Sequence, residues 1–270
     1  MRLSVGTLTV VPAGMPSRVD REVGGRAMVL GPVVGALVGG IAAGVVALAQ
    51  LVRPDADLLA AVLGVLVVAG LSGGLHLDGL ADFADALGSR RDRETMLKIM
   101  KQSDIGPFGV VAIVGVLLVD VAALTACLQA GFGWQAVLIA TTASRLTLPW
   151  SCRTSVPAAR PDGLGTVVAG TVRPLIAALT TAVVLAAALL LAWPDLLHPT
   201  TTTAAPPLAG TATDPLQFAG IAAAVLLAVA TSLITTRRAR KALGGTTGDV
   251  LGATVELALP VTLLTLALTA

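Results

Sequence analysis

Charged side chains are scarce in this chain of 270 residues. Asp, Glu, Lys and Arg together make up 13% of it, about half of the usual ~25% share. Hydrophobic residues make up 55%, and the mean hydropathy is +0.88. Because so few polar groups cannot cover a compact surface in water, the composition excludes a soluble globular protein and predicts that lipid surrounds much of the chain.

Cysteine and net charge are also low. Cys127 and Cys152 are the two cysteines, and neither belongs to a metal-binding or disulfide pattern, so we expect small buried hydrophobes. The 18 basic and 16 acidic residues leave a net charge of +2, which is too balanced for a nucleic-acid-binding protein. Residues 1–26 show no signal-peptide cleavage pattern and are expected to form a retained cytoplasmic segment.

Apolar runs of about 20 residues, by contrast, recur along the whole chain, and each is long enough to cross ~30 Å of hydrocarbon. The runs cover residues 27–52, 56–75, 108–128, 132–150, 172–193, 216–236 and 250–270. They predict an all-α, polytopic membrane protein with about seven transmembrane helices in a single membrane-embedded domain, 1–270. Polar residues interrupt the second and last runs (Asp57, Glu256), so either run is open to a partly re-entrant path.

Basic residues are concentrated on one side of the membrane that these runs would cross. Of the 18, one lies at Arg53 and one inside a run at Arg145, and the other 16 fall on a single side. Their segments are residues 1–26, 76–107, 151–173 and 237–249. Because Lys and Arg concentrate in cytoplasmic loops, we expect a cytoplasmic amino terminus and an external carboxyl terminus. The Pro/Thr-rich loop 194–215, with a solvated His198, is then an external connector.

Acidic residues gather at the end of the second run. Six of the 16 lie between Asp78 and Asp104, and in a helix Asp78, Asp82 and Asp85 share one face. Adjacent like charges destabilise a helix unless a cation neutralises them, and hard oxygen ligands suit Mg²⁺ or Mn²⁺. The pattern favours a metal site over a solvated acidic face. His76 lies on the opposite side of that helix, where a packing or a substrate-contacting role is expected.

A basic segment follows the acids, and it allows two interpretations. Arg90, Arg93 and Lys101 form either a cytoplasmic loop with an interfacial turn or a clamp for phosphoryl oxygens, which Arg binds with two parallel hydrogen bonds. Composition leaves both open.

A second polar patch lies far away in sequence, at residues 244–256. There Asp249 and Glu256 flank Gly252 on one helical face. An acid inside an apolar run is costly and is a functional-site candidate by default, so Glu256 is expected to complete the metal site or to accept a proton. Asp120, in the third run, has no neighbouring motif and is interpreted as a packing or polar-pair residue.

The two polar segments carry a family resemblance. The first contains His76-Leu77-Asp78-Gly79-Leu80-Ala81-Asp82, with Asp85 and Ile99-Met100-Lys101 after it, and the second contains Gly245-x-Thr247-Gly248-Asp249-x-Leu251-Gly252-Ala253-x-x-Glu256. Together they resemble the cobalamin synthases, the adenosylcobinamide-GDP ribazoletransferases of bacterial B12 assembly. One departure follows Lys101, where many members carry an acid: this chain has Gln102 and places its acid at Asp104.

The resemblance implies a transferase of the cell (inner) membrane that depends on Mg²⁺. It joins adenosylcobinamide-GDP to α-ribazole or its 5′-phosphate and releases GMP; other cobamide-assembly enzymes or a second copy are possible partners beside the bilayer. The implied metal ligands are Asp78, Asp82, Asp85 and Asp249. The implied substrate-binding residues are Arg90, Arg93, Lys101, Gly248 and Gly252, and the implied catalytic residues are His76, Asp82 and Glu256.

Three alternatives remain at this stage. A CDP-alcohol phosphotransferase also places aspartates at helical spacing, but it needs an arginine where Asp82 follows Ala81 here. A prenyltransferase of the aspartate-rich type needs a second such motif, which the later patch does not supply. A small transporter would use Asp120, Arg145 and Glu256 to line a path through the membrane.

Overall fold

The computed structural model describes residues 1–14, 20–192 and 215–270. His198 and nearly all of the predicted external loop 194–215 lie outside these ranges. Within them the regular elements are helices, and two isolated β-bridges join Arg153 to Val172 and Ala158 to Thr246. The predicted all-α class is therefore confirmed. The helices are α1 (Arg2–Leu8), α2 (Arg21–Val29), α3 (Gly31–Val52), α4 (Asp57–Leu71), α5 (Leu75–Gly88), α6 (Arg93–Ile99), α7 (Pro107–Gln129), α8 (Gly133–Arg145), α9 (Thr147–Ser151), α10 (Leu164–Val168), α11 (Pro174–Leu191), α13 (Pro215–Leu243) and α14 (Gly248–Ala267).

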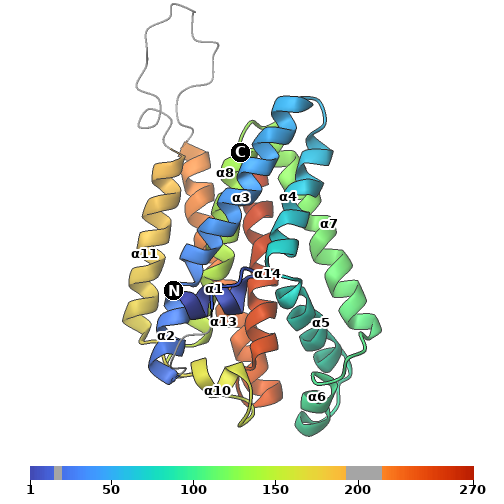
Figure 1. The fold of residues 1–270 in the computed structure, drawn as a ribbon, viewed down its shortest axis with the longest axis vertical. Helices are drawn as coiled ribbons and strands as arrows, with labels where there is room; N and C mark the ends of the chain where they lie inside the picture. The colour runs from blue at the N-terminus through green and yellow to red at the C-terminus, as the bar shows by residue number, and fades with distance from the viewer. Residues whose placement is uncertain (15–19, 193–214) are drawn as a thin grey trace, which may run out of the picture.

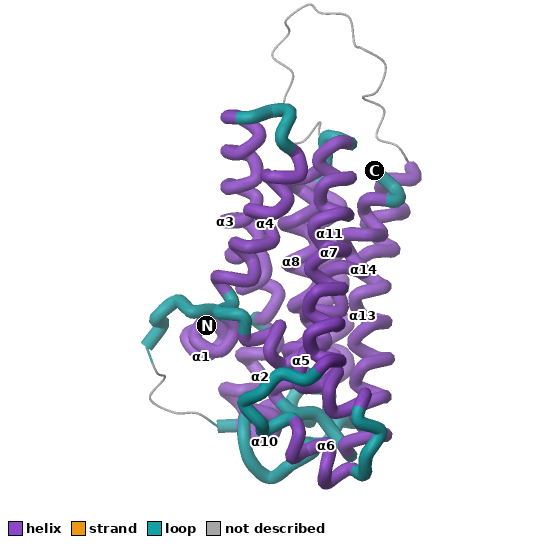
Figure 2. The backbone as a smooth tube through the Cα atoms, turned by 90° about the vertical axis from the view of Figure 1, so that its right-hand side faces the viewer, coloured by secondary structure: helices purple, strands orange, loops and turns teal. Residues whose placement is uncertain are grey.

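Long apolar helices stand side by side and form the body of the molecule (Figures 1 and 2). In the described residues, α3, α7, α11, α13 and α14 are long and apolar enough to cross a membrane, and α4 with α5 makes a sixth crossing if the two count as one span. The predicted run at 132–150 is divided into α8 and α9. The protein is thus a multi-pass membrane protein, and the predicted number of about seven crossings is approximate.

The second predicted run breaks where α4 meets α5. The two helices are bent by 85° at a short break, in which Gly73 and Gly74 adopt φ of 63° and 69°. Residues with a side chain rarely adopt this left-handed conformation, which glycine reaches without steric cost. The turn ends the membrane-crossing helix early and directs α5 toward the amino-terminal end of α14.

Basic segments collect at one end of the bundle, which we call the basic end. Helices α1, α2, α5, α6 and α10 lie there, whereas the α3–α4 turn and the carboxyl terminus lie toward the opposite end (Figure 1). The structure therefore agrees with the division of charge into two sides.

Helix α14 occupies the centre of the bundle. In the most apolar 18-residue stretch of α14, 72% of the residues are buried, against 17% in the corresponding stretch of α11. Helix α14 packs on α5, α7, α8 and α13. Large hydrophobic side chains such as Leu37, Leu118 and Val183 point outward from the surrounding helices, as expected for surfaces in contact with lipid. The two acids of α14, Asp249 and Glu256, are consequently held inside the protein.

Candidate functional site

The amino-terminal end of α14 touches α5 through a glycine. A Cβ atom at Gly79 would lie 2.7 Å from the carbonyl oxygen of Asp249, a distance that real Cβ contacts do not reach. Thr247 begins α14 and accepts a hydrogen bond from the backbone N–H of Val250 at 3.2 Å, which fixes the direction of the helix. The absence of a side chain at Gly79 lets Asp249 approach Asp78, as the pairing of the two sequence motifs predicts.

Asp78, Asp82 and Asp249 form what we call the carboxylate cluster. Asp78 is exposed and the other two are partly buried. Helix α5 packs beside α14 and α7 at the basic end. Burial, together with the negative charges of Asp78, Asp249 and Asp85, raises the pKa of Asp82 to about 7, and the charge of Arg160 lowers it only in part. Such an accumulation of like charge favours binding of a cation.

Asp85 has a different environment from the other acids of its face. Its side chain is buried, and its two oxygens accept hydrogen bonds from the backbone N–H groups of Gly106 (2.7 Å) and Gly109 (2.9 Å). It thereby holds the first turn of α7, where backbone N–H groups lack helical partners. Asp85 therefore positions α7 against α5. Its role as a metal ligand stays a prediction.

Arg160 is the cation that faces the carboxylate cluster, and sequence reasoning gave it no role. Its Nη2 lies 3.4 Å from Oδ2 of Asp249, and its Nε lies 3.5 Å from Asp162. Its Nη1 is buried and has no hydrogen-bond partner among the described residues. An unpaired guanidinium donor beside clustered carboxylates is suited to a phosphoryl oxygen.

Two of the three basic residues predicted to bind phosphate have other partners. Arg93 donates to the carbonyl oxygens of Leu243 (2.7 Å) and Ala159 (2.5 Å), which ties α6 to α13 and to the loop between α9 and α10. Lys101 pairs with Asp162 at 2.7 Å, with both side chains more than half exposed. Arg90 is exposed and has a positive φ of 51°. The geometry thus favours the loop interpretation for Arg93. Lys101 and Arg160 share an ion-pair partner, Asp162.

A second group of ionisable side chains lies deeper in the bundle. This buried charge cluster consists of His76 (3% exposed), Asp120 (1%), Arg145 (0%) and Glu256 (4%), from α5, α7, α8 and α14. Nδ1 of His76 lies 3.8 Å from Oε1 of Glu256, and the charge of Arg145 acts on both acids. Glu256 therefore lies beside His76 and Arg145, two helical turns from Asp249.

Several polar atoms of the buried charge cluster have no hydrogen-bond partner among the described residues. They include both ring nitrogens of His76, both carboxylate oxygens of Asp120, and Nε and Nη2 of Arg145. Arg145 does donate from Nη1 to the Ser144 hydroxyl at 3.0 Å. The charge of Arg145 acts on Asp120, but no hydrogen bond or ion pair joins the two side chains among the described residues, so the polar-pair role of Asp120 stays a prediction.

A metal site can be tested against this geometry. In the described ranges, no three of His, Cys, Asp and Glu stand close enough together to enclose an ion. Mg²⁺, however, is usually held by one or two carboxylates together with water and substrate phosphates. Asp78, Asp82 and Asp249 supply hard oxygens and an uncompensated negative charge, so the residues present fit such a partial shell.

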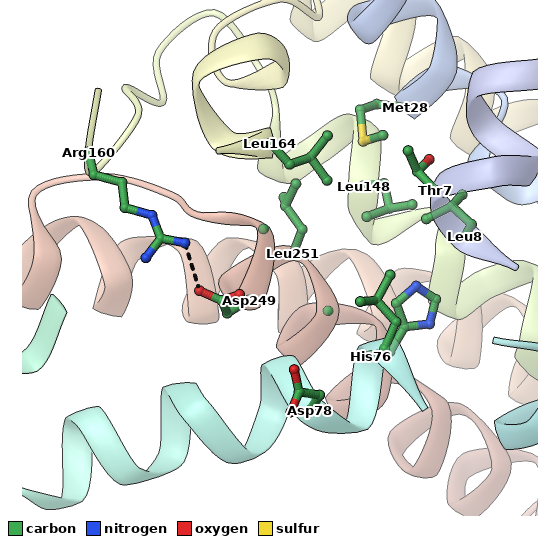
Figure 3. A pocket seen from close by; sticks show the side chains of 13 residues that line it. Thr7, Leu8, Met28, His76, Asp78, Leu148, Arg160, Leu164, Asp249 and Leu251 are labelled. Atoms are coloured by element: carbon green, nitrogen blue, oxygen red, sulfur yellow. Dashed lines mark hydrogen bonds and ion pairs between the residues drawn. The ribbon is translucent and has the colours of Figure 1, made fainter. Parts of the chain in front are cut away.

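A cavity of about 200 Å³ opens beside the carboxylate cluster (Figure 3). Gly248 and Gly252 line it, as the resemblance predicts, together with Asp78, Asp249 and Arg160. A Cβ atom at Gly252 would lie 3.1 Å from the Cα of His76, so this glycine also lets α14 pack closely on α5. The cavity is the place where the two sequence motifs and the loop carrying Arg160 meet.

Comparison with known proteins shows which family this sequence matches. The sequence pattern of the family described as cobalamin-5-phosphate synthase matches residues 1–267. The chain is 38% identical to an adenosylcobinamide-GDP ribazoletransferase of Frankia casuarinae, over 99% of this chain and 94% of that protein. It is 36% identical to the proteins of the same name from Nocardioides sp. (97% and 96%) and from Pseudomonas aeruginosa (97% and 94%). No solved structure matches.

Proposed function

The chain belongs to the cobalamin-5-phosphate synthase family and is an enzyme, and we propose that its carboxylate cluster carries out the transfer for which its relatives are named. The donor is adenosylcobinamide-GDP, and the acceptor is α-ribazole or its 5′-phosphate. The products are GMP and the completed cobamide. This reaction uses the cavity at the basic end, where the two family motifs meet.

The reaction exchanges one phosphorus–oxygen bond for another. A ribose hydroxyl of the ribazole attacks the phosphorus that carries the cobinamide, and the bond from that phosphorus to the bridging oxygen breaks, so that GMP leaves with the electron pair. Asp78, Asp82 and Asp249 would hold Mg²⁺, which when bound neutralises charge that develops on the diphosphate. Nη1 of Arg160 donates to a phosphoryl oxygen. An oxygen of Asp82 that does not hold the metal accepts the hydroxyl proton.

The residues of the buried charge cluster support the carboxylate cluster from deeper in the bundle. Glu256 and His76 are buried and face each other across α14 and α5, so we assign Glu256 to holding His76 and its helix in place. Asp120 and Arg145 belong to the same enclosed group. The comparisons favour neither the CDP-alcohol phosphotransferase nor the transporter hypothesis.

The orientation follows from the charge distribution. We place the basic end on the cytoplasmic side of the cell membrane, since Lys and Arg concentrate there, with the carboxyl terminus outside. Nucleotide substrates then reach the carboxylate cluster from the cytoplasm. A second copy of the chain or other enzymes of cobamide assembly are compatible partners on this side.

One observation carries the proposal most strongly: Gly79 brings Asp249 of α14 against the acidic face of α5. The test is GMP release from adenosylcobinamide-GDP by the purified protein in detergent, with and without α-ribazole and Mg²⁺. We expect release only with both, and a loss of at least about 100-fold in Asp82→Asn, since even outer-shell changes at metal sites cost 10- to 100-fold.

The matched control is Asp55→Asn, at an exposed position in the turn between α3 and α4, which should retain full activity. Full activity of Asp82→Asn at saturating Mg²⁺ would contradict the metal assignment. Absence of GMP release by the unchanged protein would contradict the proposed reaction itself.

A further inference from the structure

The cavity beside the carboxylate cluster has two chemically different halves. Asp78, Asp249 and Arg160 line one half, whereas Leu8, Met28 and Leu148 lie on the other (Figure 3). Leu164 and Leu251 stand between them. The hydroxyl of Thr7, also at the apolar half, is occupied, since it donates to the carbonyl oxygen of Leu3 at 2.7 Å.

The apolar wall is a fixed part of the core. Leu8, Met28, Leu148 and Leu251 are each at most 4% exposed, although they come from α1, α2, α9 and α14. Helix α1 is held in place by a hydrogen bond from the backbone N–H of Val10 to the carbonyl oxygen of Leu71 at 2.9 Å. Preformed apolar surfaces with few polar groups are typical of ligand pockets.

His76 contributes the polar atom at this half. Its ring is 3% exposed and lines the cavity, and its Nε2 has no hydrogen-bond partner among the described residues. Since Nδ1 faces Glu256 at 3.8 Å, Nε2 is the nitrogen free to meet a ligand. Leaving a buried polar atom without a hydrogen-bond partner costs free energy. A ligand atom that hydrogen-bonds with Nε2 recovers that free energy on binding.

The shape and polarity of the cavity discriminate between the parts of the two substrates. A corrin ring is too large for a cavity of about 200 Å³. Guanine carries polar atoms along most of its edge, and Leu and Met side chains offer them no hydrogen bonds. The base of ribazole is a benzimidazole, a flat and largely apolar bicycle with one free ring nitrogen.

We propose that this cavity is the binding subsite for the aromatic base of the ribazole. The base packs against Leu8, Met28 and Leu148, and its free ring nitrogen accepts a hydrogen bond from the Nε2–H of His76, while its ribose points toward Asp78. This inference rests on the proposed function. It assigns His76 to recognition of the acceptor rather than to proton transfer, and it gives the amino-terminal helix α1 a role in substrate binding.

The first test narrows the cavity with Leu164→Trp, at a half-buried position on the short helix α10. We expect the KM for α-ribazole to rise by about tenfold or more, as for steric changes in apolar pockets, with the KM for adenosylcobinamide-GDP within about two-fold. Leu175→Trp, on the exposed face of α11 (68% exposed), is the matched control. Leu8→Phe gives a second, smaller reduction of the cavity if Leu164→Trp does not fold.

The second test concerns His76. His76→Phe keeps an aromatic ring but removes the nitrogen, so it should reduce the preference for α-ribazole over its indole analogue, which lacks the free ring nitrogen, from about tenfold or more toward one.

The outcomes distinguish failure of the proposed reaction from failure of the proposed base subsite. If the unchanged protein releases no GMP, the proposed reaction fails. If it is active, but the cavity variants raise the KM of the donor instead of the acceptor, or leave both unchanged, the base subsite is wrong.

Discussion

The carboxylate cluster and the buried charge cluster use the same kinds of side chain in opposite surroundings. Asp78, Asp82 and Asp249 gather at the basic end next to a cavity, with Arg160 as the facing cation. Asp120 and Glu256 lie enclosed among helices around Arg145. The first group has an excess of negative charge that an added cation can neutralise, whereas the second contains its own counter-charge. We infer that the carboxylate cluster binds the metal and phosphates, whereas Asp120, Arg145 and Glu256 stabilise the fold and hold His76 beside the cavity.

Arg145→Ala should produce the largest effect on stability. The substitution leaves two buried acids without the cation whose charge acts on them, and an uncompensated buried charge costs about 3–5 kcal/mol. We expect a markedly lower melting temperature in detergent. Arg145→Lys keeps the charge and should recover part of the loss. Unchanged melting of Arg145→Ala would remove the distinction between the two clusters.

The same substitution in each cluster tests the comparison directly. Asp78→Asn should lower kcat/KM by about 100-fold or more, since it removes a metal ligand, and should leave the melting temperature unchanged because Asp78 is exposed. Asp120→Asn should do the reverse: it removes one of the two negative charges that act on Arg145 and should lower the melting temperature, with activity per folded molecule within about two-fold. Activity assays and thermal melting of both variants measure these two effects.

Arg160→Ala should reduce kcat/KM by about tenfold or more, because hydrogen bonds to charged groups contribute about 1.5–3 kcal/mol. The control is Lys101→Ala, which loses only an exposed ion pair with Asp162 and should change activity by less than about two-fold. An equal loss in both variants would favour the original prediction that Lys101 binds phosphate. Steady-state kinetics with varied adenosylcobinamide-GDP distinguish these cases.

The pH dependence of Mg²⁺ activation should give a smaller, graded effect. The pKa of Asp82 is raised to about 7, so below that pH a proton occupies the carboxylate and competes with the cation. We expect the Mg²⁺ concentration for half-maximal activity to rise about fivefold between pH 7 and pH 6, and to change little above pH 8. Lys101 lowers the pKa of Asp162, so that group does not titrate in this range. A flat dependence would contradict the role of Asp82.

The sequence predicted much of this arrangement, because composition and local spacing carry it. Apolar runs identified the helices, and the distribution of basic residues identified the basic end. The helical spacing of Asp78 and Asp82, together with the second motif at Asp249, pointed to the carboxylate cluster. Asp85 shares their helical face, but its partners are the backbone amides of Gly106 and Gly109. Helical periodicity cannot reveal a contact made by a distant loop.

Other features depend on contacts between segments that are far apart in the chain. Arg160 lies 89 residues before Asp249, and its loop has no motif that identifies a ligand. Leu8 belongs to a short helix whose contribution to the cavity follows only from tertiary packing. The early end of α4 depends on two glycines that, within an apolar run, look like ordinary membrane-helix residues.

The short α4 has a consequence for the bilayer around the protein. Its 15 residues rise about 22 Å, less than the ~30 Å of a typical hydrocarbon core. The lipid beside α4 must therefore thin locally, or polar headgroups must descend toward the α4–α5 turn. Vesicles of short-chain lipids match this side of the molecule better than long-chain ones, so membrane thickness becomes a variable to which the enzyme is sensitive.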